Sequence, residues 1–321
     1  MRPCEPGRRG ISRMKAVVMR GYGPGAFAVA DVAVPSVGRG AVRVRVAACG
    51  ANASDWEFAT GRPLYGRLAR TLMRVRVAGS DVAGVVEAVG EGVSGFAVGD
   101  RVVADTFETF GGFAELCVAK AERWVKIPER MDFITAAALP QSGAIALTAF
   151  DGTLPQNARV LVNGGGGGAG PLAIQVAKRA GAEVWAVDNA GKQDVMRAAG
   201  ADHLIDYRET DFAALDSTFD NILDLIATRP MRRVAARLTP RGIYRLVGGA
   251  TQHLIAAALP PRRTGLLIAH QGPELTARMV AQVARGEITP HIGATVPLGD
   301  APAALARMGA GDVPGKLVIT C

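Results

Sequence analysis

A run of glycines between an apolar segment and a predicted helix leaves few folds open to this chain. Residues 160–163 have the composition of a short strand, five glycines follow, and residues 171–180 predict a helix. Within the run, Gly165, Gly167 and Gly170 have the spacing of a dinucleotide-binding turn. In such a turn the first glycine permits the sharp bend, the second admits a pyrophosphate close to the backbone, and the third lets the helix pack on the strand.

The start of the predicted helix adds two residues to this site. Free N–H groups at a helix N-terminus bind anions, so we expect Gly168 and Ala169 to contact the pyrophosphate. A glycine run alone also suits a flexible linker. The flanks favour the turn, because a second apolar run, 184–187, ends in Asp188, 23 residues after Gly165. An acidic residue about 20 residues beyond the turn is where a ribose hydroxyl is held.

From residue 159 onward, predicted strands and helices alternate. We expect strands at 160–163, 184–188, 203–206, 220–225 and 243–247, and helices at 171–180, 192–199, 211–215 and 231–238. This alternation indicates a doubly wound parallel sheet. Ligands of such sheets bind at the carboxyl ends of the strands. The further predicted cofactor contacts around that crevice are Lys192, Tyr207, Ile226, Gly248 and Gly249.

Residues 15–126 are predicted to be rich in β-structure. Short valine-rich runs at 42–46, 82–89 and 98–104 are bounded by Gly, Pro and Asp, as strands are. Shorter helices are expected at 132–138, 145–150, 274–284 and 301–308, and a last strand at 315–320. The chain length suggests two domains.

Composition argues against several classes of protein. The net charge is +8, but the arginines are scattered along the chain without long runs, so a nucleic-acid interface is not indicated. No apolar stretch reaches the ~20 residues of a membrane span. The four cysteines form no CxxC pair, and the four histidines form no HxxxH pair. Residues 1–13 contain four arginines and lack the apolar core of a secretory signal, so we expect a disordered extension and a cytoplasmic protein.

Several motifs resemble the medium-chain dehydrogenase/reductase superfamily. They lie at 79–90, 96–102, 111–115, 200–207 and 315–319. The resemblance covers nearly the whole chain, and the subgroup is the zinc-free quinone oxidoreductases, which include zeta-crystallin-like and reticulon-4-interacting-protein-like members. It implies an α/β protein with a GroES-like β-barrel catalytic domain and a Rossmann domain. We accordingly divide the chain into the extension at 1–13, the catalytic domain at 14–126, the NAD(P)-binding domain at 127–284 and a segment returning to the catalytic domain at 285–321.

The residues at the expected zinc-ligand positions do not suit a metal. In zinc-dependent members, the resemblance implies, the ligands are a Cys in the stretch matching 49–55, the His of a Gly-His-Glu triplet, and a further Cys. Here the first two positions hold Asn52 and Ser80, and no Cys stands around 140–143. Catalytic zinc needs three Cys, His or carboxylate ligands, so we expect no metal ion.

Without a Lewis acid, reduction of a carbon–carbon double bond conjugated to a carbonyl is easier than reduction of a simple ketone. Hydride from nicotinamide reaches the β-carbon, and hydrogen-bond donors stabilise the enolate that forms. The predicted catalytic donors are Asn52, Ser54 and Ser80. In the alternative, structural interpretation, Asn52 and Ser54 only hold a loop, and Asp55 is the N-cap of a helix over 56–58.

Three functions remain open on the sequence. The first is a zinc-independent, NAD(P)H-dependent oxidoreductase acting on small-molecule quinones or on enals and enones. The second is a cofactor-binding scaffold or sensor with little catalysis. The third is an enoyl-thioester reductase serving acyl or polyketide chains. Residues 64–77, rich in arginine, match no motif and are expected to shape the substrate mouth. We expect a homodimer.

Asp188 favours NADH as the cofactor, because its carboxylate repels the 2′-phosphate of NADPH. Two unit charges at ~4 Å repel by about 1 kcal/mol in water and about 4 kcal/mol at an effective dielectric of about 20. Lys192 and Arg208 offset part of this repulsion, but a lysine is a flexible point charge without the fork of an arginine. The sequence therefore predicts binding of NAD(P)H with a preference for NADH.

Overall fold

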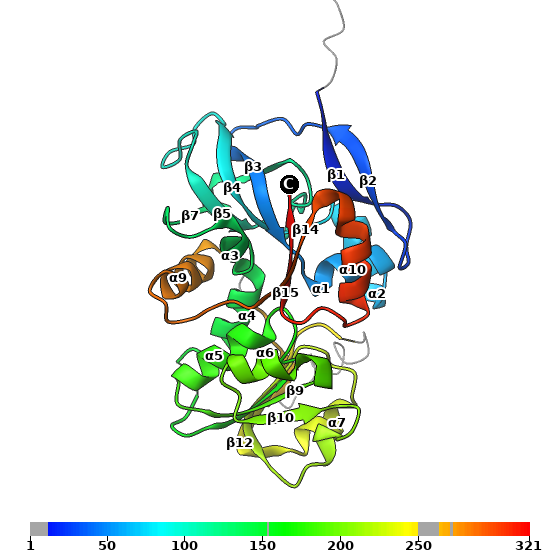
Figure 1. Cartoon of the computed structure of the whole chain (residues 1–321), viewed down its shortest axis with the longest axis vertical. Helices are drawn as coiled ribbons and strands as arrows, with labels where there is room; N and C mark the ends of the chain where they lie inside the picture. Colours follow the sequence, from blue (N-terminus) through cyan, green and yellow to red (C-terminus); the bar gives the residue numbers. More distant parts are fainter. Residues whose placement is uncertain (1–11, 153, 250–262, 270–271) are drawn as a thin grey trace, which may run out of the picture.

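The computed structural model describes residues 12–152, 154–249, 263–269 and 272–321. Figure 1 shows two bodies, one built on an antiparallel sheet and the other on a parallel sheet, with the C-terminal elements β14, β15 and α10 beside the first body. The predicted extension at 1–13 lies almost wholly outside the described residues. Its last residue, Arg13, already belongs to a strand.

The antiparallel body contains a hairpin and a larger sheet. The hairpin is β1 (Arg13–Met19) with β2 (Phe27–Ala33). Within the described residues the sheet has the order β14 (Ile292–Pro297), β15 (Lys316–Thr320), β3 (Ala41–Gly50), β4 (Asp81–Val89), β5 (Arg101–Asp105) and β7 (Val125–Lys126), with β6 (Leu116–Lys120) paired to β3. Val42, Val44 and Val46 are buried while Arg45 is exposed, so the alternation in β3 sets its inner face.

Short helices close this body. They are α1 (Ala53–Thr60), α2 (Leu64–Met73), η1 (Ala121–Arg123), η4 (Leu298–Asp300) and α10 (Ala301–Gly309). The prediction that Asp55 is the N-cap of a helix over 56–58 is wrong. Helix α1 begins earlier, its N-cap is Asn52, and Asp55 is the third helical residue. The Asp55 carboxylate accepts a hydrogen bond from the N–H of Asn52 at 2.9 Å, as the third residue of a capping box does.

The parallel body contains six described strands in one sheet. In sheet order they are β10 (His203–Asp206), β9 (Glu183–Asp188), β8 (Arg159–Asn163), β11 (Phe219–Asp224), β12 (Leu238–Leu246) and β13 (Thr264–Leu266). In chain order this is third, second, first, fourth, fifth and sixth, the order of a dinucleotide-binding doubly wound sheet. All five pairings are parallel. The predicted α/β fold, with a GroES-like domain and a Rossmann sheet, is confirmed.

Helices cover this sheet and join it to the first body. They are α3 (Phe133–Ala137), α4 (Pro140–Phe150), α5 (Gly170–Arg179), η2 (Ala190–Lys192), α6 (Gln193–Ala198), η3 (Phe212–Ala214), α7 (Met231–Ala235) and α9 (Pro273–Ala284). The helix predicted over 211–215 is a single 3-10 turn. The helix predicted over 231–238 ends at Ala235, because Leu238 pairs with Phe219 in the sheet.

Strand β15 connects the antiparallel sheet to the glycine turn. The N–H of Gly315 donates to the carbonyl of Gly166 at 2.8 Å, and the next residue, Lys316, begins the strand. The start of β15 therefore lies between the two bodies (Figure 1). Our division of the chain at 126/127 and 284/285 stays a prediction.

Candidate functional site

The glycine-rich turn lies between β8 and α5. Gly170 must be glycine for the turn to close, because a Cβ there would lie 2.3 Å from the carbonyl oxygen of Gly165. Gly168 and Ala169 are partly exposed, and within the described residues their N–H groups have no hydrogen-bond acceptor. Two free, accessible amides at the N-terminus of a ten-residue helix fit a pyrophosphate.

Asp188 and Lys192 form a buried ion pair beside this turn. Lys192 Nζ lies 3.3 Å from one carboxylate oxygen, and the other accepts the N–H of Gly166 at 3.1 Å. Asp188 is 6% exposed and Lys192 8%. From the sequence we expected Lys192 to offset only part of the negative charge of Asp188. In the structure the Asp188 carboxylate is paired with Lys192, so it repels a phosphate less strongly than a free carboxylate would.

Three other predicted cofactor contacts lie around the same strand ends. The N–H of Tyr207 donates to the carbonyl of Asp188 at 3.2 Å, so the backbone of this half-exposed residue lies beside Asp188. Ile226 is also exposed and approaches Gly164, where an added Cβ would meet its side chain at 3.1 Å. Gly249 packs against Ala227. These contacts bring the predicted residues to one crevice, and their binding roles stay predictions.

Asp224 organises the strand ends and was missed in the sequence. Its Oδ1 accepts hydrogen bonds from Asn163 Nδ2 at 2.7 Å and from the N–H of Ala227 at 2.7 Å. Its Oδ2 accepts the hydroxyl of Tyr244 at 3.0 Å. The available signal was an acidic residue at the end of an apolar strand, the same signal that identified Asp188.

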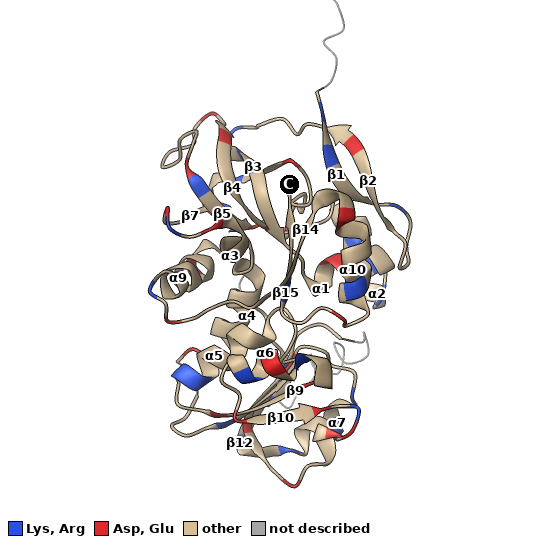
Figure 2. Ribbon diagram, in the orientation of Figure 1, with Lys and Arg blue, Asp and Glu red and all other residues tan. Residues whose placement is uncertain are grey.

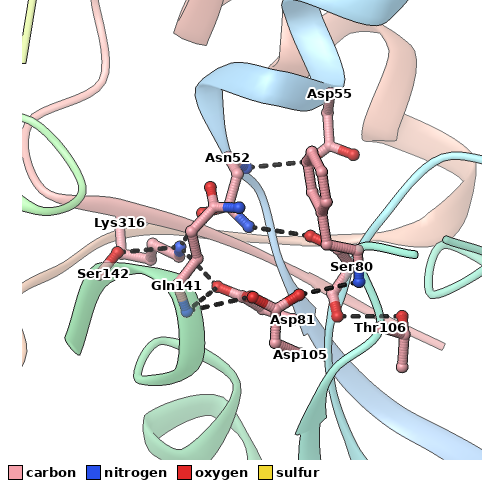
Figure 3. A network of polar contacts seen from close by, with 10 residues as sticks. Asn52, Asp55, Ser80, Asp81, Asp105, Thr106, Gln141, Ser142 and Lys316 are labelled. Carbon is pink, nitrogen blue, oxygen red and sulfur yellow. Dashed lines mark hydrogen bonds and ion pairs between the residues drawn. The ribbon is translucent and has the colours of Figure 1, made fainter. Parts of the chain in front are cut away.

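A second polar group is buried where the two bodies meet (Figure 3). Lys316 Nζ donates to Asn52 Oδ1 at 2.6 Å, Asp81 Oδ2 at 3.0 Å and Ser142 Oγ at 3.1 Å. The four residues come from the start of α1, from β4, from α4 and from β15. None is more than 6% exposed. Since each of the three protons of the ammonium has an oxygen partner, the buried charge is fully hydrogen-bonded.

The ammonium fixes the orientation of the Asn52 amide. Oδ1 must face Lys316, so Nδ2 faces the opposite way and donates to Ser80 Oγ at 3.3 Å. An amide nitrogen has two hydrogens, and a side-chain hydrogen bond from Asn52 also opposes the rise in the pKa of Asp81. The predicted donors Asn52 and Ser80 therefore lie together. Ser54 is not part of this group: its Oγ is buried without a hydrogen-bond partner among the described residues.

The acidic residues of this region are held in a dry environment. Asp55 is completely buried, and burial raises its pKa to about 7, although hydrogen bonds from the N–H groups of Asn52 and Gly79 oppose the shift. Burial also raises the pKa of Asp81, against the opposing charge of Lys316. The N–H of Gln141 adds hydrogen bonds to Asp81 at 3.2 and 3.4 Å.

Lys316, Asp81 and Ser142 were not among the site residues predicted from the sequence. Both charged residues begin strands whose next residues are apolar, and a buried charge in such a place has to find a partner. That pattern was the one available signal. Among the described residues, no three His, Cys, Asp or Glu side chains gather to hold a metal ion. Zinc independence itself stays a prediction.

The region 64–77, expected to shape the substrate mouth, forms α2 and its C-terminal continuation. Tyr65 Oη donates to Glu57 Oε2 at 2.7 Å, and both side chains approach the predicted cofactor contact Gly248, where an added Cβ would lie 3.3 Å from each. Burial raises the pKa of Glu57 to about 7. This pair borders the crevice from the side of α2.

Comparison with known proteins agrees with this architecture. The model for the alcohol dehydrogenase GroES-like domain matches residues 38–129, and that for zinc-binding dehydrogenase matches 199–319. The chain is 36% identical over 217 residues to a chloroplast envelope quinone oxidoreductase homolog of Arabidopsis thaliana, covering 64% of each protein. It is 28% identical to the chloroplastic quinone oxidoreductase QR1 of Triphysaria versicolor, covering 95% of this chain and 98% of that one.

A solved structure and a larger enzyme also match. The quinone oxidoreductase of Coxiella burnetii superposes with a TM-score of 0.88 at 25% identity, covering 97% of this chain and all of that one. Erythronolide synthase EryA2 of Saccharopolyspora erythraea is 32% identical over 295 residues, which is 88% of this chain and 8% of the synthase. The chain belongs to the medium-chain dehydrogenase/reductase superfamily, a family of nicotinamide-dependent oxidoreductases. Two of the relatives that it matches along nearly its whole length are quinone oxidoreductases, and two others are alcohol dehydrogenases.

No described helix is long and apolar enough to cross a membrane.

Proposed function

We propose that this protein is a zinc-independent, NAD(P)H-dependent reductase of quinones or of activated carbon–carbon double bonds. The observation that carries the proposal is the Asn52 amide, whose oxygen Lys316 holds so that its nitrogen faces Ser80. The Lys316 ammonium already contacts Oδ1 of Asn52 and Oδ2 of Asp81, and a metal ion at these two atoms would have to displace it. The similarity to quinone oxidoreductases supports the same conclusion.

The turn and the strand ends would hold the cofactor. Gly168 and Ala169 would donate to the pyrophosphate, Gly165, Gly167 and Gly170 keep the backbone free of side chains there, and Asp188 would face the adenosine ribose. When bound, the reduced nicotinamide supplies a hydride. The protein contributes orientation and exclusion of water.

The buried polar group would stabilise the negative charge that develops on the substrate oxygen. The amide nitrogen of Asn52 and the hydroxyl of Ser80 are the proposed donors, and the ammonium of Lys316 holds the amide oxygen. Donors that are held in place before the reaction stabilise a developing oxyanion without reorganisation. The proton that completes the reduction comes from solvent, so no side chain has to be a general acid.

A second function has specific support. The similarity to part of a polyketide synthase favours an enoyl-thioester reductase, which uses the same hydride transfer to a conjugated double bond. A scaffold with little catalysis is the third possibility. The homodimer and the cytoplasmic location stay predictions.

A panel of acceptors, followed by the loss of NAD(P)H absorbance, separates the three functions. We expect turnover with a short-chain quinone and a small enone, and kcat/KM at least about tenfold lower with an enoyl thioester of the same chain. The reverse order would assign the thioester function. Nucleotide binding without turnover of any acceptor would assign the scaffold. The Asn52→Leu variant, which keeps the side-chain size but removes the donor, should lose about 100-fold in kcat.

We also propose that NADH is preferred over NADPH, and that Lys192 limits the preference. Replacing Lys192 by methionine should leave Asp188 unpaired and raise the ratio of kcat/KM for NADH over NADPH by about tenfold, since repulsion across ~4 Å costs about 1 kcal/mol or more. Asp188→Asn should move the ratio the other way. Asp194→Asn, in an exposed pair with Arg197, is the control. An unchanged ratio in both variants would show that this pair does not select the cofactor.

A further inference from the structure

Helix α2 presents a row of leucines to solvent. Leu64, Leu68 and Leu72 are spaced four residues apart, so they lie on one face of the helix. They are 67%, 60% and 73% exposed. Single exposed apolar residues are ordinary, but three in a row on a ten-residue helix form a continuous apolar strip. We call this strip the leucine row.

The leucine row is held outward by contacts on the opposite side of the helix. Arg70 donates to the carbonyl of Met19 at 2.7 Å, and its guanidinium lies 4.6 Å from the ring centre of Tyr22. Ala69 and Met73 pack against the core of the antiparallel body. Since these contacts anchor the helix, the exposure of the leucines follows from its orientation.

Arginines surround the leucine row, and no acidic residue stands between positions 58 and 80. The exposed members are Arg62, Arg67, Arg74 and Arg76. No carboxylate of the described chain forms an ion pair with any of the four. Figure 2 shows Lys and Arg colouring along α2 at the outer side of the antiparallel body.

We propose that α2 binds the surface of an anionic lipid bilayer, with the leucine row among the acyl chains and the arginines at the headgroups. A short helix with an apolar face and a cationic border suits this environment. A second copy of the chain is a poorer occupant, because two such surfaces facing each other would bring together eight arginines, four from each copy, that have no carboxylate partner in the described residues. The binding does not depend on the proposed reaction.

The position of α2 determines which part of the protein would face the bilayer. Tyr65 of the same helix approaches Gly248 at the cofactor crevice, where an added Cβ would lie 3.3 Å from the tyrosine hydroxyl. A bilayer in contact with the leucine row would therefore lie next to the mouth of the crevice.

Sedimentation of the purified full-length protein with vesicles tests the proposal. We expect binding to vesicles of mixed phosphatidylglycerol and phosphatidylcholine, and at least tenfold weaker binding to phosphatidylcholine alone or to the mixed vesicles in about 0.5 M salt, where surface charges are screened. Leu64→Gln with Leu68→Gln and Leu72→Gln should weaken binding at least tenfold. Arg62→Gln with Arg74→Gln should also weaken it. Circular dichroism checks that each variant is folded.

Matched controls change equally exposed residues elsewhere. Val98→Gln replaces a side chain that is 68% exposed, and Arg39→Gln replaces an exposed arginine; neither should change vesicle binding. Wild-type protein that stays in the supernatant with anionic vesicles would overturn the proposal, as would a leucine variant that binds like wild type. A wild-type dimer that the leucine variant converts to a monomer in analytical ultracentrifugation would assign the row to self-association instead.

Discussion

Replacing Lys316 by methionine is expected to destabilise the folded protein by about 3–5 kcal/mol, because it leaves the buried Asp81 carboxylate without its cation. Lys316 is 1% exposed and Asp81 is completely buried, so water cannot replace the lost partner. Urea unfolding followed by circular dichroism measures the change. Lys120→Met, at a side chain that is 72% exposed, should change the free energy of unfolding by less than about 0.5 kcal/mol.

The double variant Lys316→Met with Asp81→Asn separates stability from catalysis. Removing both charges avoids the unpaired carboxylate, so this variant should be clearly more stable than Lys316→Met alone. It still lacks the group that orients the Asn52 amide, and we expect kcat to stay reduced by about 100-fold with a smaller change in KM. A stable double variant with wild-type kcat would show that Lys316 has a structural role only.

Valine at two positions of the glycine turn should have different effects: at Gly170 it should impair folding, and at Gly167 it should impair only nucleotide binding. At Gly170 a Cβ would lie 2.3 Å from the carbonyl oxygen of Gly165, so Gly170→Val should destabilise the fold by about 3 kcal/mol or more. At Gly167 the nearest atom is the carbonyl oxygen of Gly164 at 3.4 Å, an ordinary contact. Gly167→Val should therefore fold normally and lose at least about 100-fold in nucleotide affinity, because the side chain fills the space of the pyrophosphate.

Thermal unfolding and nucleotide titration, measured on the same preparations, distinguish the two effects. Gly299→Val is the control, since a Cβ at Gly299 has no neighbour within 4 Å and lies outside the turn. Wild-type affinity in a folded Gly167→Val protein would mean that the cofactor does not pass over this glycine. Normal stability of Gly170→Val would mean that the turn has a different backbone path.

The parallel sheet could be predicted because its signals are local. The apolar runs are short, glycines mark the turn, and helices separate the strands, so one order of elements was favoured. Errors arose where local signals compete. Asp55 looks like an N-cap in the sequence, but Asn52 takes that position. The helix expected to reach 238 ends at Ala235, because pairing of β12 with β11 outweighs helix propensity there.

The buried polar group could be predicted only in part, because it is assembled from distant segments. Asn52 and Ser80 stand at recognisable positions of a family motif. Lys316 reaches Asn52 across 264 residues of sequence, and no local pattern reports such a contact. Lys192 was foreseen as an influence on Asp188, since four residues separate them, but burial of the pair was not. Burial depends on how α6 and the turn pack, which the sequence does not show.

Turnover by protein of known metal content, in the presence of a chelator, tests whether the reaction is independent of zinc. Two values of kcat/KM are compared. One is for reduction of a quinone or small enone by NADH or NADPH, and the other is for oxidation of a simple alcohol by the oxidised cofactors. We expect at most about 0.1 zinc per chain, unchanged reduction in chelator, and alcohol oxidation at least about 100-fold slower, because no Lewis acid activates the alcohol. About one zinc per chain, lost together with activity, or alcohol oxidation faster than every reduction, would contradict this expectation.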